Sequence, residues 1–182
     1  MVQMELTSRD VTERTLKMNK TTEAIVDFLR SRSKSVQRQE EGENLVIKEV
    51  HYPKWVTRDR YDVCRRGSRQ HAVRSGGVPS REGGYSMVFS ISFISDFASA
   101  TFFDTLDVAK GPSLGTNFTL ACLYTLLAHP FELELAAEHG LEKGLVRVSV
   151  GLEDVDMLLS LFKEALTKTE NAVGLQRVEA QS

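Results

Sequence analysis

The sequence predicts an α+β fold, in which helices cover one face of a small, mainly antiparallel sheet and a long helix precedes the first strand. Segments near both ends of the chain carry apolar residues at helical spacing, whereas several short segments between them alternate in the manner of strands. Strands and helices do not follow the strict alternation that a parallel sheet requires. A length of 182 residues, 41% of them hydrophobic, suits a single core.

The amino-acid composition argues against several classes of protein. The 23 basic and 25 acidic side chains give a net charge of -2, which predicts no general affinity for nucleic acids or membranes. The sequence has no apolar run of 18 residues and starts with a polar segment, so we expect neither a membrane span nor a secretory signal. Its two cysteines, Cys64 and Cys122, are expected to be reduced thiols of a cytoplasmic protein.

The first segment, residues 9–32, predicts one long helix. Its apolar positions follow helical spacing, and Ser8 can cap its start. The next ordered segment, residues 45–50, is short and rich in β-branched side chains, which favours a strand. Pro53 then ends this strand because proline has no N–H to donate.

A basic stretch follows at residues 54–81, with Lys54 and seven arginines against two aspartates. Residues 66–84, which overlap the end of this stretch, are rich in glycine and polar side chains and predict a mobile basic loop. The arginines could bind phosphates, with Trp55 and Tyr61 as stacking surfaces. A solvated loop, neutralised by the acidic remainder of the protein or by a partner, is the interpretation that the balanced net charge favours.

Order returns in the second half of the chain. Residues 85–93 alternate with a period of two and give the clearest strand. Residues 95–105 are in helical register, and residues 106–109 predict a short strand before Gly111-Pro112. Further helices are predicted at residues 117–127 and 130–140.

Two elements close the predicted fold. Valines alternate with other residues over 145–150, which indicates a strand with Arg147 in its middle. Residues 154–168 form an amphipathic helix with acids at its start and lysines towards its end. We therefore expect one domain over residues 1–172 and a disordered tail over residues 173–182.

Arg147 is the most informative residue, because a strand of valines brings its guanidinium close to buried surface, where an unpaired charge is costly. One interpretation is an arginine at the sheet edge that pairs with Glu142, Glu153 or Asp154. The other is a planar fork on a rigid strand that receives a substrate carboxylate through two parallel hydrogen bonds.

The small-residue turn Ser113-Leu114-Gly115 lies between a predicted strand and a predicted helix. Such turns are mostly connections, although a hydroxyl and a backbone N–H here could also serve a carboxylate beside Arg147. The four histidines and two cysteines lack the spacing of metal ligands, and the common nucleophile and phosphate-binding motifs are absent from the sequence. We therefore expect no metal site.

Several of the sequence features described above occur together in one known protein family. Ser113-Leu-Gly115, a helix, His129 and the run Leu-Val-Arg-Val-Ser-Val-Gly-Leu-Glu-Asp that ends at Asp154 resemble the C-terminal domain of the Cys/Met metabolism family of pyridoxal-phosphate enzymes. This family includes cystathionine γ-synthase and cystathionine γ-lyase. The resemblance is dense over residues 111–166 and extends in outline over nearly the whole chain.

The resemblance implies roles for particular residues. Arg147 matches the arginine that holds the α-carboxylate of the amino-acid substrate, and Ser113 with Leu114 matches the segment lying against that carboxylate and the cofactor lysine. The family's Schiff-base lysine and its phosphate-binding residues belong to a large preceding domain, so no catalytic or cofactor-binding residue is expected here. Pro112 and Ala128 replace the acidic residue and the threonine that the cystathionine-cleaving members tend to carry.

Three functions remain open. The favoured one is the small, substrate-carboxylate-binding domain of such an enzyme, acting as a fragment, a subunit or a shortened descendant in transsulfuration-type or related specialised metabolism. The second is a non-catalytic module for oligomerisation or interaction with a partner chain that carries the cofactor domain. The third is a scaffold reused for a cofactor-independent reaction around Arg147. Whether the chain is itself an enzyme stays open.

Overall fold

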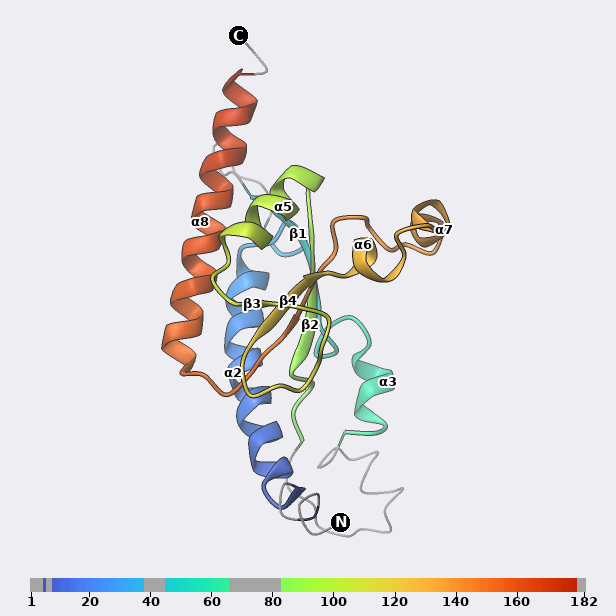
Figure 1. Cartoon of the computed structure of the whole chain (residues 1–182), viewed down its shortest axis with the longest axis vertical. Helices are drawn as coiled ribbons and strands as arrows, with labels where there is room; N and C mark the ends of the chain where they lie inside the picture. Colours follow the sequence, from blue (N-terminus) through green and yellow to red (C-terminus); the bar gives the residue numbers. More distant parts are fainter. Residues whose placement is uncertain (1–4, 6–7, 38–44, 66–82, 180–182) are drawn as a thin grey trace.

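The computed structural model describes residues 5, 8–37, 45–65 and 83–179 (Figure 1). The predicted mobile loop therefore lies almost entirely outside the described residues, at positions 66–82. Of the helices within the described residues, none is long and apolar enough to cross a membrane.

A five-stranded sheet forms the centre of the fold, in the order β1-β2-β5-β4-β3. All neighbouring pairs are antiparallel except the short pair of β3 with β4. This arrangement confirms the predicted α+β class and the mainly antiparallel sheet. The strands are β1 (Ile47–His51), β2 (Val88–Phe93), β3 (Ala109–Lys110), β4 (Leu120–Leu123) and β5 (Val146–Ser149).

Three long helices cover one face of this sheet: α2 (Val11–Ser31), α5 (Asp96–Thr105) and α8 (Val155–Glu179) (Figure 1). Between them and the sheet lies an apolar core in which the centre of the Phe162 ring is 6.1 Å from that of Phe89 and 6.3 Å from that of Phe102. On the opposite side of the sheet, the described residues form only short helices, α3 (Arg58–Asp62), α6 (Tyr124–Ala128) and α7 (Leu133–Glu138) (Figure 1). Helices of the described residues therefore leave most of that face uncovered.

The helix predicted at residues 117–127 is wrong in its first half, because Leu120–Leu123 is strand β4. Leu120, Ala121 and Cys122 are all buried, on both faces of a strand flanked by β5 and β3. A strand buried on both faces shows no alternation, so its apolar run resembles that of a helix. The helix begins only at Tyr124.

Other boundaries also differ from prediction. The helix expected at residues 130–140 is shorter, at Leu133–Glu138, and the short strand lies at Ala109–Lys110 rather than at 106–109. Helix α8 continues to Glu179, so residues 173–179 of the expected disordered tail are helical, and residues 180–182 lie outside the described residues. Thr169 and Val173 stay buried beyond the predicted helix end, so contacts with the rest of the fold extend along it.

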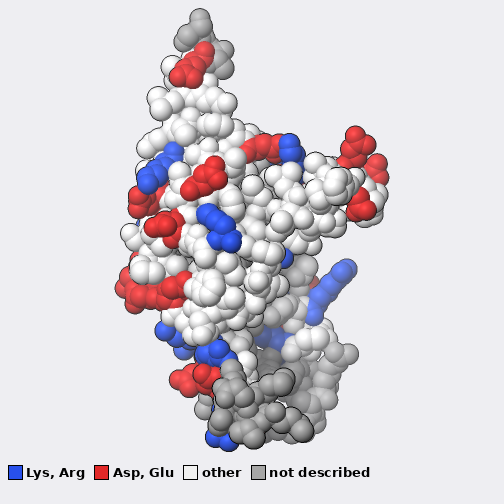
Figure 2. All heavy atoms as spheres, in the orientation of Figure 1, with Lys and Arg blue, Asp and Glu red and all other residues white. Residues whose placement is uncertain are grey.

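Helices α6 and α7 form a projection at residues 124–139, which stands away from the sheet (Figure 1). Acidic side chains gather at its end, where Glu132, Glu134 and Glu138 are exposed (Figure 2). Phe131 is 97% exposed on the same projection.

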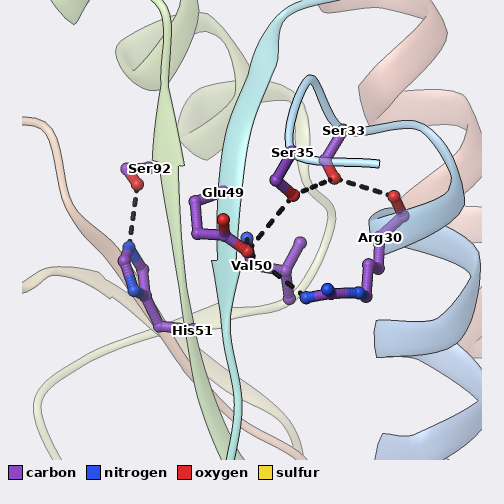
Figure 3. Close-up of polar contacts among 7 residues, drawn as sticks. All are labelled: Arg30, Ser33, Ser35, Glu49, Val50, His51 and Ser92. Carbon is purple, nitrogen blue, oxygen red and sulfur yellow. Dashed lines mark hydrogen bonds and ion pairs between the residues drawn. The ribbon is translucent and has the colours of Figure 1, made fainter. Parts of the chain in front are cut away.

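One edge of the sheet, at β1, is covered by side chains and by the segment after α2 (Figure 3). A Glu49 carboxylate oxygen accepts hydrogen bonds from the Ser35 hydroxyl at 3.2 Å and from the Val50 N–H at 3.2 Å, and it pairs with the Arg30 guanidinium at 3.4 Å. Ser33 forms a parallel bridge with the first residue of β1. These contacts occupy polar groups that would otherwise attract another strand.

Candidate functional site

A row of polar and reactive side chains crosses the face of the sheet that the long helices leave open. His51, Ser90, Arg147 and Cys122 occupy matching positions on the neighbouring strands β1, β2, β5 and β4. Because side chains alternate along a strand, these four point away from the core to which their strand neighbours belong. The register thus gathers an imidazole, a hydroxyl, a guanidinium and a thiol on one surface.

Arg147 lies at the centre of this row and is partly exposed. Its Nη2 atom donates a hydrogen bond to the Pro112 carbonyl oxygen. The guanidinium carbon lies 5.0 Å from the centre of the Tyr124 ring, within the range of a cation–π contact. Arg147 is thus held by a backbone carbonyl oxygen and by an aromatic ring.

The acidic residues considered as partners of Arg147 have other partners. Glu142 pairs with Lys48 at 2.8 Å, and Glu153 accepts two hydrogen bonds from the residue that precedes β4. Asp154 accepts two backbone N–H groups from the first turn of α8, at 2.9 and 3.0 Å. Among the described residues no ion pair involves Arg147, so the structural pairing that was its alternative explanation is wrong.

The loop between β3 and β4 approaches Arg147 from one side. Pro112 accepts the guanidinium hydrogen bond, and the Gly115 N–H donates to the Ser149 hydroxyl, two residues along β5, at 3.2 Å. Gly115 has φ of +73°, a conformation that favours glycine. Ser113 and Leu114 lie between these two contacts in the chain, and both are exposed. No hydrogen bond among the described residues joins Ser113 to Arg147, so the loop meets Arg147 through Pro112.

Beside Arg147 the open face contains a hollow of about 440 Å³. Its lining residues are His51, Ser90, Tyr124, Gly140, Leu141, Leu145 and Arg147. At one end, the His51 imidazole Nε2 shares a hydrogen bond of 2.9 Å with the Ser92 hydroxyl (Figure 3). A cationic fork, an imidazole, a hydroxyl and two leucines can together receive a small organic anion with a short side chain.

Sequence analysis did not assign His51, Ser90 or Tyr124 to this site. The period of two placed Ser90 on the polar face of its strand, but the alignment of that face with Arg147 depends on cross-strand register. Tyr124 fell within the helix predicted at residues 117–127, part of which is strand β4. Only the folded arrangement brings these residues together.

The Cys122 thiol beside Arg147 is buried. Burial raises the pKa of this thiol, because a thiolate is poorly solvated there, while the neighbouring guanidinium partly opposes that rise. The net increase in pKa keeps Cys122 a neutral thiol at neutral pH, so it is a poor nucleophile.

No family model matches the chain, but individual proteins of known sequence and structure are similar to it. The chain is 48% identical over 175 residues to a cystathionine γ-synthase-like enzyme of Amanita muscaria, covering 96% of the chain and 27% of that relative. It is 39% identical over 168 residues to the cystathionine γ-synthase of Saccharomyces cerevisiae, covering 91% of the chain and 23% of the relative.

Solved structures agree with the sequence relatives. The cystathionine γ-synthase of Xanthomonas oryzae matches with a TM-score of 0.63 at 20% identity, over 90% of this chain and the C-terminal 36% or so of that one. The chain corresponds to the C-terminal domain of the cystathionine γ-synthase and γ-lyase family. This domain spans about a quarter of the length of the curated relatives that it matches.

Enzymes of this family depend on pyridoxal phosphate, which an enzyme lysine holds as an imine. All nine lysines of the chain lie in its described part, and none lines the hollow at Arg147. Lys110, which adjoins the loop in sequence, donates from Nζ to the carbonyl oxygens of Phe103 and Leu106 at the end of α5. The hollow at Arg147 therefore offers no lysine amine that could hold the cofactor as an imine, whereas a guanidinium has the charge and planar shape that suit a carboxylate.

Proposed function

We propose that the domain binds the α-carboxylate of an amino-acid substrate for a cystathionine γ-synthase-like enzyme of sulfur amino-acid or related specialised metabolism in the cytoplasm. Arg147 receives the carboxylate, and the loop with Ser113 and Leu114 lies against the bound substrate. The pyridoxal phosphate is held by a cofactor domain that the 182 residues do not contain, on the same polypeptide or on a partner.

One observation carries this proposal: Arg147 has no acidic partner among the described residues, yet it borders a hollow. An arginine beside buried surface is costly unless its charge is compensated. Pro112 and Tyr124 stabilise the guanidinium but neutralise no charge. A ligand carboxylate provides the missing negative charge and fits the planar fork through two parallel hydrogen bonds.

The test is a titration of the purified chain with L-alanine at constant ionic strength, followed by the nuclear magnetic resonance signals of residues around the hollow. We expect saturable shifts at Tyr124 and Arg147. Arg147→Lys keeps the charge but loses the fork, and is expected to raise the dissociation constant about tenfold. Arg32→Lys is the matched control, because Arg32 pairs with Glu170 on α8, outside the hollow. Equal affinities for wild type and Arg147→Lys would overturn the proposal.

A second candidate is association through the α6–α7 projection, with another copy or with a partner that carries the cofactor domain. Phe131 is 97% exposed there, and Leu127 and Leu135 are each more than half exposed. Apolar side chains gathered on one projection are typical of a contact surface. Light scattering is expected to show a species larger than one chain that Phe131→Ser converts to monomer, and a clean wild-type monomer would count against self-association.

A further inference from the structure

Tyr124 contacts Arg147 but has no role in the site predicted from the sequence. Its ring centre lies 5.0 Å from the guanidinium carbon, and both side chains line the same hollow. The carbonyl oxygen of Pro112 binds Nη2 of the same guanidinium. Tyr124 and Pro112 therefore restrict Arg147 from two directions.

The backbone of Tyr124 is fixed at the junction of a strand and a helix. Tyr124 is the first residue of α6, directly after β4, and its N–H donates to the Leu145 carbonyl oxygen at 2.9 Å. Leu145 precedes strand β5, which carries Arg147 two residues further on. One backbone hydrogen bond thus ties the two segments that present the ring and the guanidinium.

The Tyr124 ring also packs against the His129 imidazole. The two ring centres lie 6.0 Å apart, and the ring planes are 76° apart, as in an edge-to-face pair. The Nδ1 atom of His129 lies 3.6 Å from a Glu132 carboxylate oxygen. The ring beside Arg147 is therefore supported by the α6–α7 projection.

We propose that Tyr124 is a positioning residue, whose ring holds the Arg147 guanidinium with its free N–H groups directed into the hollow for a carboxylate. This inference rests on the proposed function of Arg147. A long arginine side chain loses rotamer freedom when it binds a ligand, and a side chain already held in place loses less. The contact is made by the ring face, so phenylalanine replaces tyrosine in this role, whereas leucine does not.

The test compares Tyr124→Leu with Tyr124→Phe in the full chain. In the wild type and in Tyr124→Phe, we expect the Arg147 Nε–Hε resonance to carry an upfield ring-current shift that disappears in Tyr124→Leu. The dissociation constant for L-alanine is expected to rise about threefold to tenfold in Tyr124→Leu. In Tyr124→Phe it is expected to change less than twofold. Phe97→Leu is the matched control, because this half-exposed ring on α5 lies on the helical side of the sheet.

The outcomes separate this inference from the proposed function. If Arg147→Lys weakens L-alanine binding while Tyr124→Leu leaves both the affinity and the Arg147 resonance unchanged, the positioning role is wrong and the carboxylate site stands. If Arg147→Lys has no effect, the proposed function fails. If L-alanine does not bind to the wild type, the proposed function fails and the positioning role fails with it. Should Tyr124→Leu not fold, a nuclear Overhauser contact between Arg147 Hε and the Tyr124 ring protons in the wild type decides. Its absence overturns the positioning role.

Discussion

Glu153 ties the loop that carries Pro112 to the end of β5, and replacing it with alanine is expected to destabilise the fold. Its two carboxylate oxygens accept hydrogen bonds from the Thr119 N–H at 2.5 Å and the Thr119 hydroxyl at 3.0 Å. The same hydroxyl accepts the Gly151 N–H at 3.0 Å. Thr119 is only 1% exposed, so water does not readily replace the lost acceptor.

The expected loss follows from these contacts. A hydrogen bond to a charged group contributes roughly 1.5–3 kcal/mol, and a buried N–H left without an acceptor costs about 1–3 kcal/mol. These contributions overlap, and Glu153 itself is partly exposed, so we expect Glu153→Ala to lower the free energy of unfolding by about 2–4 kcal/mol. For a chain of this size that corresponds to a decrease in Tm of roughly 5–15 °C.

Urea unfolding followed by fluorescence measures this loss, because Trp55 is the only tryptophan. Glu164→Ala is the matched control: Glu164 pairs with Lys168 on α8 at 2.7 Å, but both side chains are more than half exposed. Such a pair contributes only about 0.3–0.5 kcal/mol. A Glu153→Ala variant within about 0.5 kcal/mol of this control would show that the Glu153 contacts do not stabilise the loop.

Two further predictions concern buried groups with raised pKa values. Burial raises the pKa of Tyr52 above its ordinary 10.0, so above pH 10 the unfolded chain loses a proton that the folded chain keeps, and stability falls as pH rises. Tyr52→Phe loses the hydrogen bond to the Ser86 carbonyl oxygen, so its free energy of unfolding at neutral pH is expected to fall by about 1 kcal/mol. In urea titrations above pH 10, its free energy of unfolding is expected to decrease less steeply with pH than that of the wild type. An unchanged slope would contradict this. Iodoacetamide is expected to alkylate exposed Cys64 in the folded chain and to reach Cys122 only after unfolding, as peptide mass spectrometry would show. Equal labelling rates at the two cysteines would refute the burial of Cys122.

Local patterns were sufficient to predict the elements that bury one face. Helix α2, strand β2 and helix α8 each have one apolar face against the core, so the periods of 3.6 and 2 marked them in the sequence. Strand β4 was missed because it is buried on both faces. Its apolar run continues into α6 without a break, so nothing local marks Tyr124 as the start of the helix.

The site was predictable only where one residue violated its local pattern. Arg147 was conspicuous because a charge among valines conflicts with burial, and such conflicts point to function. His51 and Tyr124 conflict with nothing nearby: one ends an edge strand and the other begins a short helix. The relation of His51 to Arg147 comes from the registers of β1 with β2 and of β2 with β5, and that of Tyr124 from its backbone hydrogen bond to Leu145, just before β5.

The two faces of the sheet differ in composition: one packs its apolar side chains against the helices, and the other carries the polar row that we propose binds a ligand. Phe89, Val148 and Ala121 face the helices and supply apolar burial, while their strand neighbours Ser90, Arg147 and Cys122 form the open face. Ser90 and Arg147 on that open face contribute little to the core, so each is free to serve a ligand. A carboxylate bound at Arg147 would compensate the positive charge of this partly desolvated guanidinium, so ligand binding would stabilise the folded chain. Under the proposed function, Tyr124 and Pro112 contact the guanidinium without neutralising it, and an acidic partner there would compete with the proposed ligand.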